Sequence, residues 1–277
     1  MLITVTQTRH TSTVEATLAA AAFGSEPGSW PLPSATTPQQ TWLRAVAAGG
    51  QGRYASAYRD LALLRRSVPT GPLISLGLST QGSFLRQLGW HTLARRWDGR
   101  ALALAGGDPE ARGDALIGLA ADALGVGRFA AAATLLTRVD PVLMQHAPVP
   151  DRLAVRLRWV AAELAMASGD GPGAARHAEE AVERAQAMVV SSVRHRVKSD
   201  VVLAAALCSA GSIERARAVA EAVLDATGRL GLIPLRWALA CLLIDIGSVT
   251  FAPPELCEIR DVCAGQVRRA GGTWRSA

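Results

Sequence analysis

From about residue 39 onward, apolar side chains recur at spacings of three and four residues, and glycine or proline interrupts the pattern every 15 to 20 residues. This periodicity is typical of amphipathic helices. The one run that favours a β-strand, residues 189–193 (VVSSV), is short and lies between two helical patterns. The chain is therefore predicted to be all-α.

Three small residues recur at fixed spacing in five successive units of this helical region. In each unit an alanine follows a glycine by five residues, and another small residue lies twelve residues before that alanine. The glycines are Gly52, Gly89, Gly127, Gly169 and Gly211, the alanines are Ala57, Ala94, Ala132, Ala174 and Ala216, and the earlier small residues are Ala45, Gly82, Ala120, Ala162 and Ala204. A glycine can take the left-handed conformation that ends a helix, and small side chains let antiparallel helices cross closely. We therefore expect about five antiparallel helix hairpins stacked as a right-handed α-solenoid, with a compact bundle of independent hairpins as the alternative.

The segments at the two ends of the chain differ from this central region. Four prolines between residues 24 and 38 exclude a continuous helix there, so residues 1–38 are expected to be a partly disordered lead-in with one short helix. The helical repeats are expected over residues 39–233. Residues 234–270 are expected to form capping helices that cover the last apolar edge, and residues 271–277 a loose tail.

Two segments carry a family resemblance. Residues 45–69 (AVAAGGQGRYASAYRDLALLRRSVP) and 118–141 (GLAADALGVGRFAAAATLLTRVDP) resemble tetratricopeptide repeats. In the first, the residues at the positions that the family pattern favours are Ala45, Gly52, Tyr54, Ala57, Leu61 and Pro69. The resemblance covers roughly residues 39–230. The chain departs from the family in its longer repeats, which exceed the usual 34 residues or so, and in Asp98, which stands where the family has an apolar residue.

The resemblance implies a concave groove lined by the first helix of each pair and a protein partner bound in it. The groove-facing residues would include Trp42, Arg86, Arg156, Trp159, Glu163, Met166, Lys198 and Val201. Arg152, Arg194 and Arg196 would form a basic patch. Because Arg156, Trp159, Glu163 and Met166 are spaced by three, four and three, they share one helical stripe. An exposed tryptophan beside arginine is typical of a recognition hot spot; the alternative is that Trp159 belongs to the core and the arginines are solvated.

The family's best-known peptide clamp uses asparagine side chains against the ligand backbone, and this chain contains no asparagine. A different mode of binding is therefore expected.

The charges of the chain favour an acidic partner without indicating nucleic acid. The chain has 29 basic and 23 acidic residues, and Lys198 is the only lysine. Abundant arginine and alanine are typical of a GC-rich genome and so carry little functional information. Basic and acidic residues are nearly balanced in each half of the chain, which argues against a nucleic-acid surface.

No pattern of residues indicates catalysis, a cofactor or a metal. The five histidines lie in five different segments, and the four cysteines form no CxxC pair. The glycine clusters at residues 49–52 and 169–173 follow no predicted strand, so they are not expected to bind phosphate. His177 and Glu180 are the one histidine–carboxylate pair on a shared helix face, and we expect them to be solvated. Residues 14–23 form the most apolar stretch near the start, and they are too few to cross a bilayer. These features predict a reduced, cytoplasmic protein that is not an enzyme.

The function predicted from the sequence is a protein–protein interaction scaffold or adaptor, with a regulatory role and a partner segment that is acidic in part. Two alternatives remain open: a nucleic-acid-associated regulator that uses arginine-rich helix faces, and the sensory remnant of a larger transcriptional regulator. The sequence leaves the oligomeric state undetermined.

Overall fold

The computed structural model describes residues 2–144 and 149–275, with side chains from residue 13 onward. In these ranges the chain is entirely helix and loop, with no strand. In chain order the helices are α1 (Leu2–Phe23), α2 (Pro38–Gly50), α3 (Tyr54–Ser67), α4 (Pro72–Gln87), α5 (His91–Leu104), α6 (Pro109–Gly125), α7 (Phe129–Thr137), α8 (Asp140–Leu143), α9 (Arg152–Ala167), α10 (Gly171–Ala187), α11 (Val193–Ser209), α12 (Ile213–Arg229), α13 (Ile233–Ile246) and α14 (Pro253–Arg269). The prediction of an all-α fold is confirmed.

The five marked glycines lie where one helix ends and the next begins. Each has a positive φ angle, between 76° and 87°, which favours glycine over every other residue. The following helix begins two residues after the glycine in all five cases. Each alanine five residues after the glycine is fully buried, as expected for a residue at which two helices cross closely.

Successive helices pack side by side, and the first helices of neighbouring pairs also pack against one another. The pairs α2–α3, α4–α5, α6–α7, α9–α10, α11–α12 and α13–α14 are in contact. The first helices also contact one another along the series α2, α4, α6, α9, α11 and α13. The first helices therefore form a continuous row, here called the inner row.

The C-terminal end of the helical array is hydrogen-bonded to its N-terminal end. The backbone N–H of Ala55, in the first turn of α3, donates to the carbonyl of Ala270 at 2.7 Å. Farther along, Arg275 N–H donates to the Leu88 carbonyl at 2.9 Å, and the Trp90 indole donates to the Thr273 carbonyl at 2.7 Å. Residues 271–275 thus hold α14 against the first two helix pairs, which differs from the loose tail expected from the sequence.

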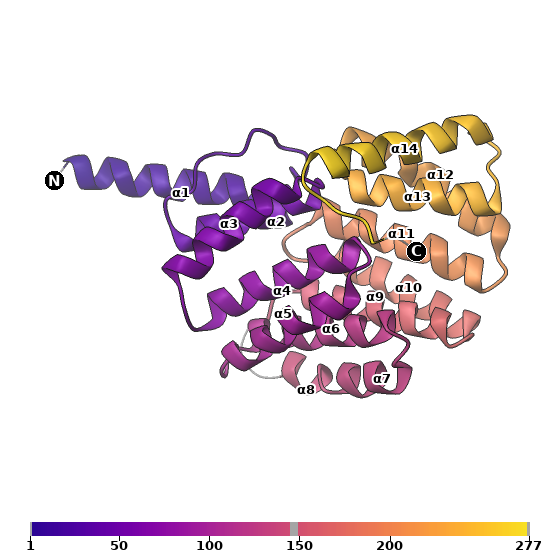
Figure 1. Cartoon of the computed structure of the whole chain (residues 1–277), viewed down its shortest axis with the longest axis horizontal. Helices are drawn as coiled ribbons and strands as arrows, with labels where there is room; N and C mark the ends of the chain where they lie inside the picture. The colour runs from indigo at the N-terminus through magenta and orange to yellow at the C-terminus, as the bar shows by residue number, and fades with distance from the viewer. Residues whose placement is uncertain (1, 145–148, 276–277) are drawn as a thin grey trace.

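The N-terminal lead-in also differs from the expectation of one short helix followed by disorder. Helix α1 spans 22 residues and extends away from the body (Figure 1). The segment after it lies against the body, because the Gln51 side-chain amide donates to the carbonyls of Pro27 and Ser29. Val193 N–H donates to the Gly24 carbonyl at 3.1 Å, which ties the end of α1 to the start of α11. No helix in the described ranges is both long and apolar enough to cross a membrane.

Candidate functional site

The inner row of helices surrounds a hollow of about 440 Å³. Its walls come from α2, α4, α6, α9 and α11, with Phe23 at the end of α1 and Pro234 and Leu235 at the start of α13. Side chains from the first, middle and last parts of the chain therefore meet here. This arrangement depends on the contacts between the two ends of the array.

Most of the residues predicted to face a groove line this hollow. They are Trp42, Arg86, Arg156, Trp159, Glu163 and Lys198. Arg152 and Arg194, which were predicted to belong to a basic patch, also line it. The basic side chains on the walls outnumber the carboxylates, which are Asp114 and Glu163. The hollow is thus a mixed aromatic and cationic site.

Three of the predicted residues do not line the hollow. Met166 packs beside the α9–α10–α11 core cluster, because it lies two turns beyond Trp159, or about 10 Å farther along α9. Val201 lies three residues after Lys198, on a neighbouring part of α11, but it is buried in the cluster formed with α12 and α13 and does not reach the wall of the hollow. Arg196 is exposed on α11 outside the hollow.

Trp159 is half-buried: it packs against the α9–α10–α11 core cluster and also forms part of the wall of the hollow. Its indole N–H donates to the Ser199 hydroxyl at 2.8 Å, which fixes the ring plane. The ring stacks on His195, with ring centroids 5.3 Å apart. The Lys198 ammonium lies 5.9 Å from the ring centroid and 3.6 Å from Glu163 Oε1. His195 covers one face of the indole, so an occupant of the hollow can contact only the part of the ring that His195 leaves uncovered.

Arg86 joins the hollow to a buried acidic pair. Its guanidinium pairs with Asp98 on α5 and with Asp122 on α6, and both carboxylates are fully buried. Burial raises the pKa of Asp98 to about 7 and also raises the pKa of Asp122. A Cβ atom on Gly82 or on Gly118 would collide with the Asp98 carboxylate. The acidic residue that departs from the tetratricopeptide pattern is thus accommodated by two glycines and one arginine.

Three further arginines gather where α9 and α11 approach the end of α1. Arg152, Arg156 and Arg194, here called the arginine cluster, all line the hollow. Burial lowers the pKa of Arg152 and lowers the pKa of Arg156 and of Arg194 to about 10. Their nearby carboxylates are Glu110, which pairs with Arg152, and Asp114, which pairs with Arg152 and Arg156. Because these three positive charges have only two carboxylates as partners, the cluster favours the binding of an anion.

The sequence did not identify four ring side chains that line the hollow, namely Phe23, Phe84, His91 and His195. His195 lies three residues before Lys198, so its place on the same helix face was readable. The ring is 2% exposed, and burial together with the nearby arginines lowers the pKa of His195 well below its usual value. Phe23 belongs to the lead-in and reaches the hollow only through the packing of α1. No local pattern could have indicated that contact.

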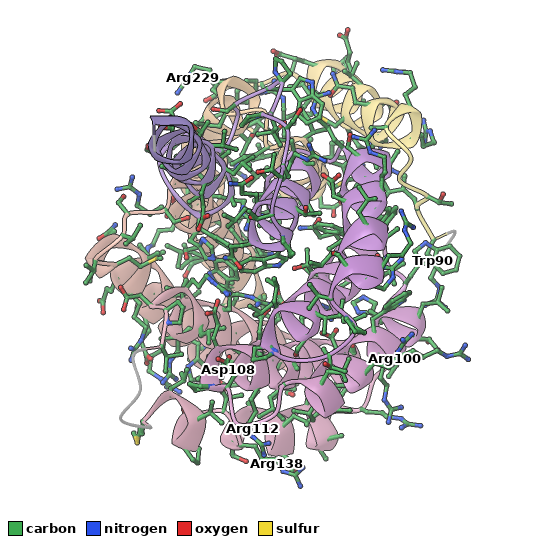
Figure 2. The ribbon with its side chains drawn as sticks, turned by 90° about the vertical axis from the view of Figure 1, so that its left-hand side faces the viewer. Trp90, Arg100, Asp108, Arg112, Arg138 and Arg229 are labelled. Atoms are coloured by element: carbon green, nitrogen blue, oxygen red, sulfur yellow. The ribbon has the colours of Figure 1, made fainter. Side chains whose placement is uncertain are left out.

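The outer face of α3 and α5 exposes more basic than acidic side chains, although basic and acidic residues are nearly balanced in each half of the sequence. Asp60 turns inward to pair with Arg44 through two hydrogen bonds of 2.8 and 2.6 Å, and Asp98 turns inward to Arg86. The arginines left exposed on these two helices are Arg59, Arg66, Arg95, Arg96 and Arg100. Arg100, on α5, points away from the body in Figure 2. Because the acidic side chains of α3 and α5 point into the protein and these arginines point into solvent, the outer face has a net positive charge.

Among the described residues, no three His, Cys, Asp or Glu side chains come together as metal ligands. His146 lies outside the described residues, and the side chain of His10 is not described. Comparison with known proteins finds no family model that matches the chain and no curated protein with significant similarity to it. The function is therefore argued from the hollow itself.

Proposed function

We propose that this protein is a binding module that receives an acidic segment of a partner protein in its central hollow. In this proposal the helices form a degenerate tetratricopeptide-like solenoid, right-handed, with about five hairpins and with α13 and α14 as the cap. The observation that carries the proposal is the half-buried Trp159, which faces the hollow with Arg156 and Lys198 on the same walls.

The charge and the aromatic content of the walls support an acidic segment with an apolar side chain. Five basic side chains line the hollow, namely Arg86, Arg152, Arg156, Arg194 and Lys198, against the carboxylates of Asp114 and Glu163. Buried aromatic and arginine side chains dominate the free energy of many protein interfaces. A partner that offers a carboxylate beside an aromatic or branched residue would satisfy both parts of the wall.

The volume of the hollow limits what can enter. One turn of α-helix, about 10–12 Å across and 5.4 Å long, occupies roughly 500 Å³, which is comparable to the 440 Å³ available. We therefore expect the partner to contribute a short segment, such as a chain end or the tip of a loop. Such an interaction suits a regulatory adaptor that recruits or sequesters its partner. The cytoplasm suits a chain with four free cysteines.

Selection from a displayed library of short random peptides tests this proposal. We expect acidic peptides with an aromatic residue to be enriched on the wild-type protein. The double variant Arg156→Ala, Trp159→Ala should bind the selected peptides at least 30-fold more weakly, because truncating one partner of a buried charged contact costs about 2 kcal/mol or more.

The matched control is Arg196→Ala, which removes an exposed arginine of α11 outside the hollow and should leave binding unchanged. Circular dichroism and thermal unfolding establish that each variant is folded. Peptides that bind the double variant as tightly as the wild type would show that the hollow is not the partner site.

A further inference from the structure

The arginine cluster is built from two neighbouring inner helices and one aromatic ring. Arg152 and Arg156 lie one turn apart on α9, and Arg194 comes from the first turn of α11. The Arg152 and Arg194 guanidinium carbons lie 4.8 and 5.8 Å from the centroid of the Phe23 ring. The Phe23 ring thus brings two cations together at one end of the hollow.

The cluster has more positive than negative charge. Arg152 pairs with Glu110 and Asp114, and Arg156 pairs with Asp114. Arg194 has no carboxylate within 4.0 Å in the described part of the chain. Besides burial, the positive charge of Arg152 lowers the pKa of Arg194. Three guanidinium groups thus form ion pairs with two carboxylates, while Arg86 and Asp98 act on Arg156 with opposite signs. A single negative charge placed among the three guanidinium groups would balance the cluster.

His195 does not supply charge to this part of the site. Its Nδ1 atom lies 2.8 Å from the Ser192 hydroxyl oxygen. Burial and the three arginines hold its pKa well below the usual value, so the imidazole is neutral at neutral pH. Its ring and that of Trp159 are stacked with an interplanar angle of 19°. His195 thus backs the Trp159 ring, and Trp159 lines the same hollow as the guanidinium groups.

We propose that the arginine cluster binds the carboxylate of a small aromatic monoanion, with the aromatic ring of the ligand lying on the wall that contains Trp159. Guanidinium groups bind carboxylates through paired, charge-assisted hydrogen bonds. A hollow of 440 Å³ has the size of small-molecule sites in proteins, which span about 300–1,000 Å³. The inference rests on the proposed function only in placing the occupant inside the hollow, since a free small molecule can fill the site without any partner protein.

Titration calorimetry with naphthoate, its neutral amide naphthamide, and acetate tests the inference. The wild-type protein should bind naphthoate at least 10-fold more tightly than naphthamide, because only naphthoate balances the charge of the cluster. Acetate should bind more weakly than naphthoate because it lacks the ring. Equal affinity for naphthoate and naphthamide would overturn the inference.

Arg194→Gln is the decisive variant because Arg194 forms no ion pair in the described structure, so its removal should leave the unliganded protein folded. We expect Arg194→Gln to weaken naphthoate binding at least 10-fold and to leave naphthamide binding unchanged. Arg196→Gln, two residues away and exposed, should bind naphthoate like the wild type. Naphthoate affinity that is the same in both variants would place the anion elsewhere and contradict the inference.

The partner-protein function and the small-molecule site can be contradicted independently of each other. Tight naphthoate binding that depends on Arg194, together with no hollow-dependent peptide, would remove the partner-protein function and retain the small-molecule site. Selected peptides that require Trp159, together with no naphthoate binding, would retain the partner function and remove this inference.

Discussion

Replacing Arg86 with alanine is expected to lower the free energy of unfolding by about 3–5 kcal/mol, because it leaves Asp98 and Asp122 buried without their counter-charge. Both carboxylates are fully buried, and the Arg86 side chain is 11% exposed. For a chain of this size the loss corresponds to a melting temperature lower by on the order of 10 °C. Urea and thermal unfolding followed by circular dichroism measure the change.

Two companion variants separate the buried charge from the general effect of losing an arginine. Arg95→Ala removes an exposed arginine of α5 and should change stability by no more than about 0.5 kcal/mol. Adding Asp98→Asn to Arg86→Ala should recover part of the lost stability, because one of the two stranded carboxylates is then neutral. If Arg86→Ala and Arg95→Ala unfold alike, Arg86 does not balance the buried acids.

The stability of the wild type relative to Asp98→Asn is expected to fall as pH rises from about 4 to about 7. Burial and the nearby Asp122 charge, partly offset by Arg86, raise the pKa of Asp98 from 3.8 to about 7. The folded protein therefore retains a proton that the unfolded chain releases near pH 4. A group whose pKa is raised by folding stabilises the protein at low pH, and that stabilisation is lost as pH passes through the folded-state pKa.

Chemical denaturation of both proteins at a series of pH values measures this difference, which should reach a few kcal/mol across the range. His195 titrates with the opposite sign, because folding lowers its pKa. Its contribution is common to both proteins and cancels in the comparison. Because Asp98 and Asp122 both pair with Arg86 and influence each other's pKa, the comparison reports the titration of this acidic pair. A difference that stays constant from pH 4 to pH 7 would mean that the pair takes up no proton on folding.

The helices were predictable because their signals are local. Spacings of three and four identify each amphipathic segment, and a glycine with positive φ ends the first helix of each pair regardless of what packs on it. The same reasoning placed α13 and α14 in the segments expected for the cap. The prediction that Arg86, Arg156 and Trp159 share one surface came from the resemblance to tetratricopeptide repeats, in which the first helices line the groove, and all three residues line the hollow.

The features that the sequence did not reveal depend on contacts between distant segments. The hydrogen bonds of residues 271–275 to the turns near Ala55 and Leu88 form only when the two ends of the array meet. Phe23 enters the hollow for the same reason. Met166 and Val201 were placed in the hollow wrongly because the periodicity of a helix defines a stripe without defining how much of that stripe faces the opening.

The sequence does contain a signal for the buried ion pairs, although it was not recognised. Arg44 with Asp60 and Arg86 with Asp98 repeat the same arrangement, an arginine on the first helix of a pair and an acid on the second. An acid at a position where the repeat pattern favours an apolar residue, preceded by an arginine on the inner helix, indicates a buried ion pair. The second partner of Arg86, Asp122, comes from the next pair and follows no such rule.

The central claim is that the helical array closes on itself and so encloses the hollow. Double electron–electron resonance tests it most directly, with spin labels at Arg59→Cys on α3 and Arg268→Cys on α14 in a protein whose four native cysteines have been replaced. Both positions are exposed and close to the hydrogen bond between Ala55 and Ala270. The labels lie four and two residues from that bond, so a closed array predicts one narrow distance distribution centred below about 30 Å. A broad distribution, or one centred at a clearly longer distance, would show an open array and contradict the account.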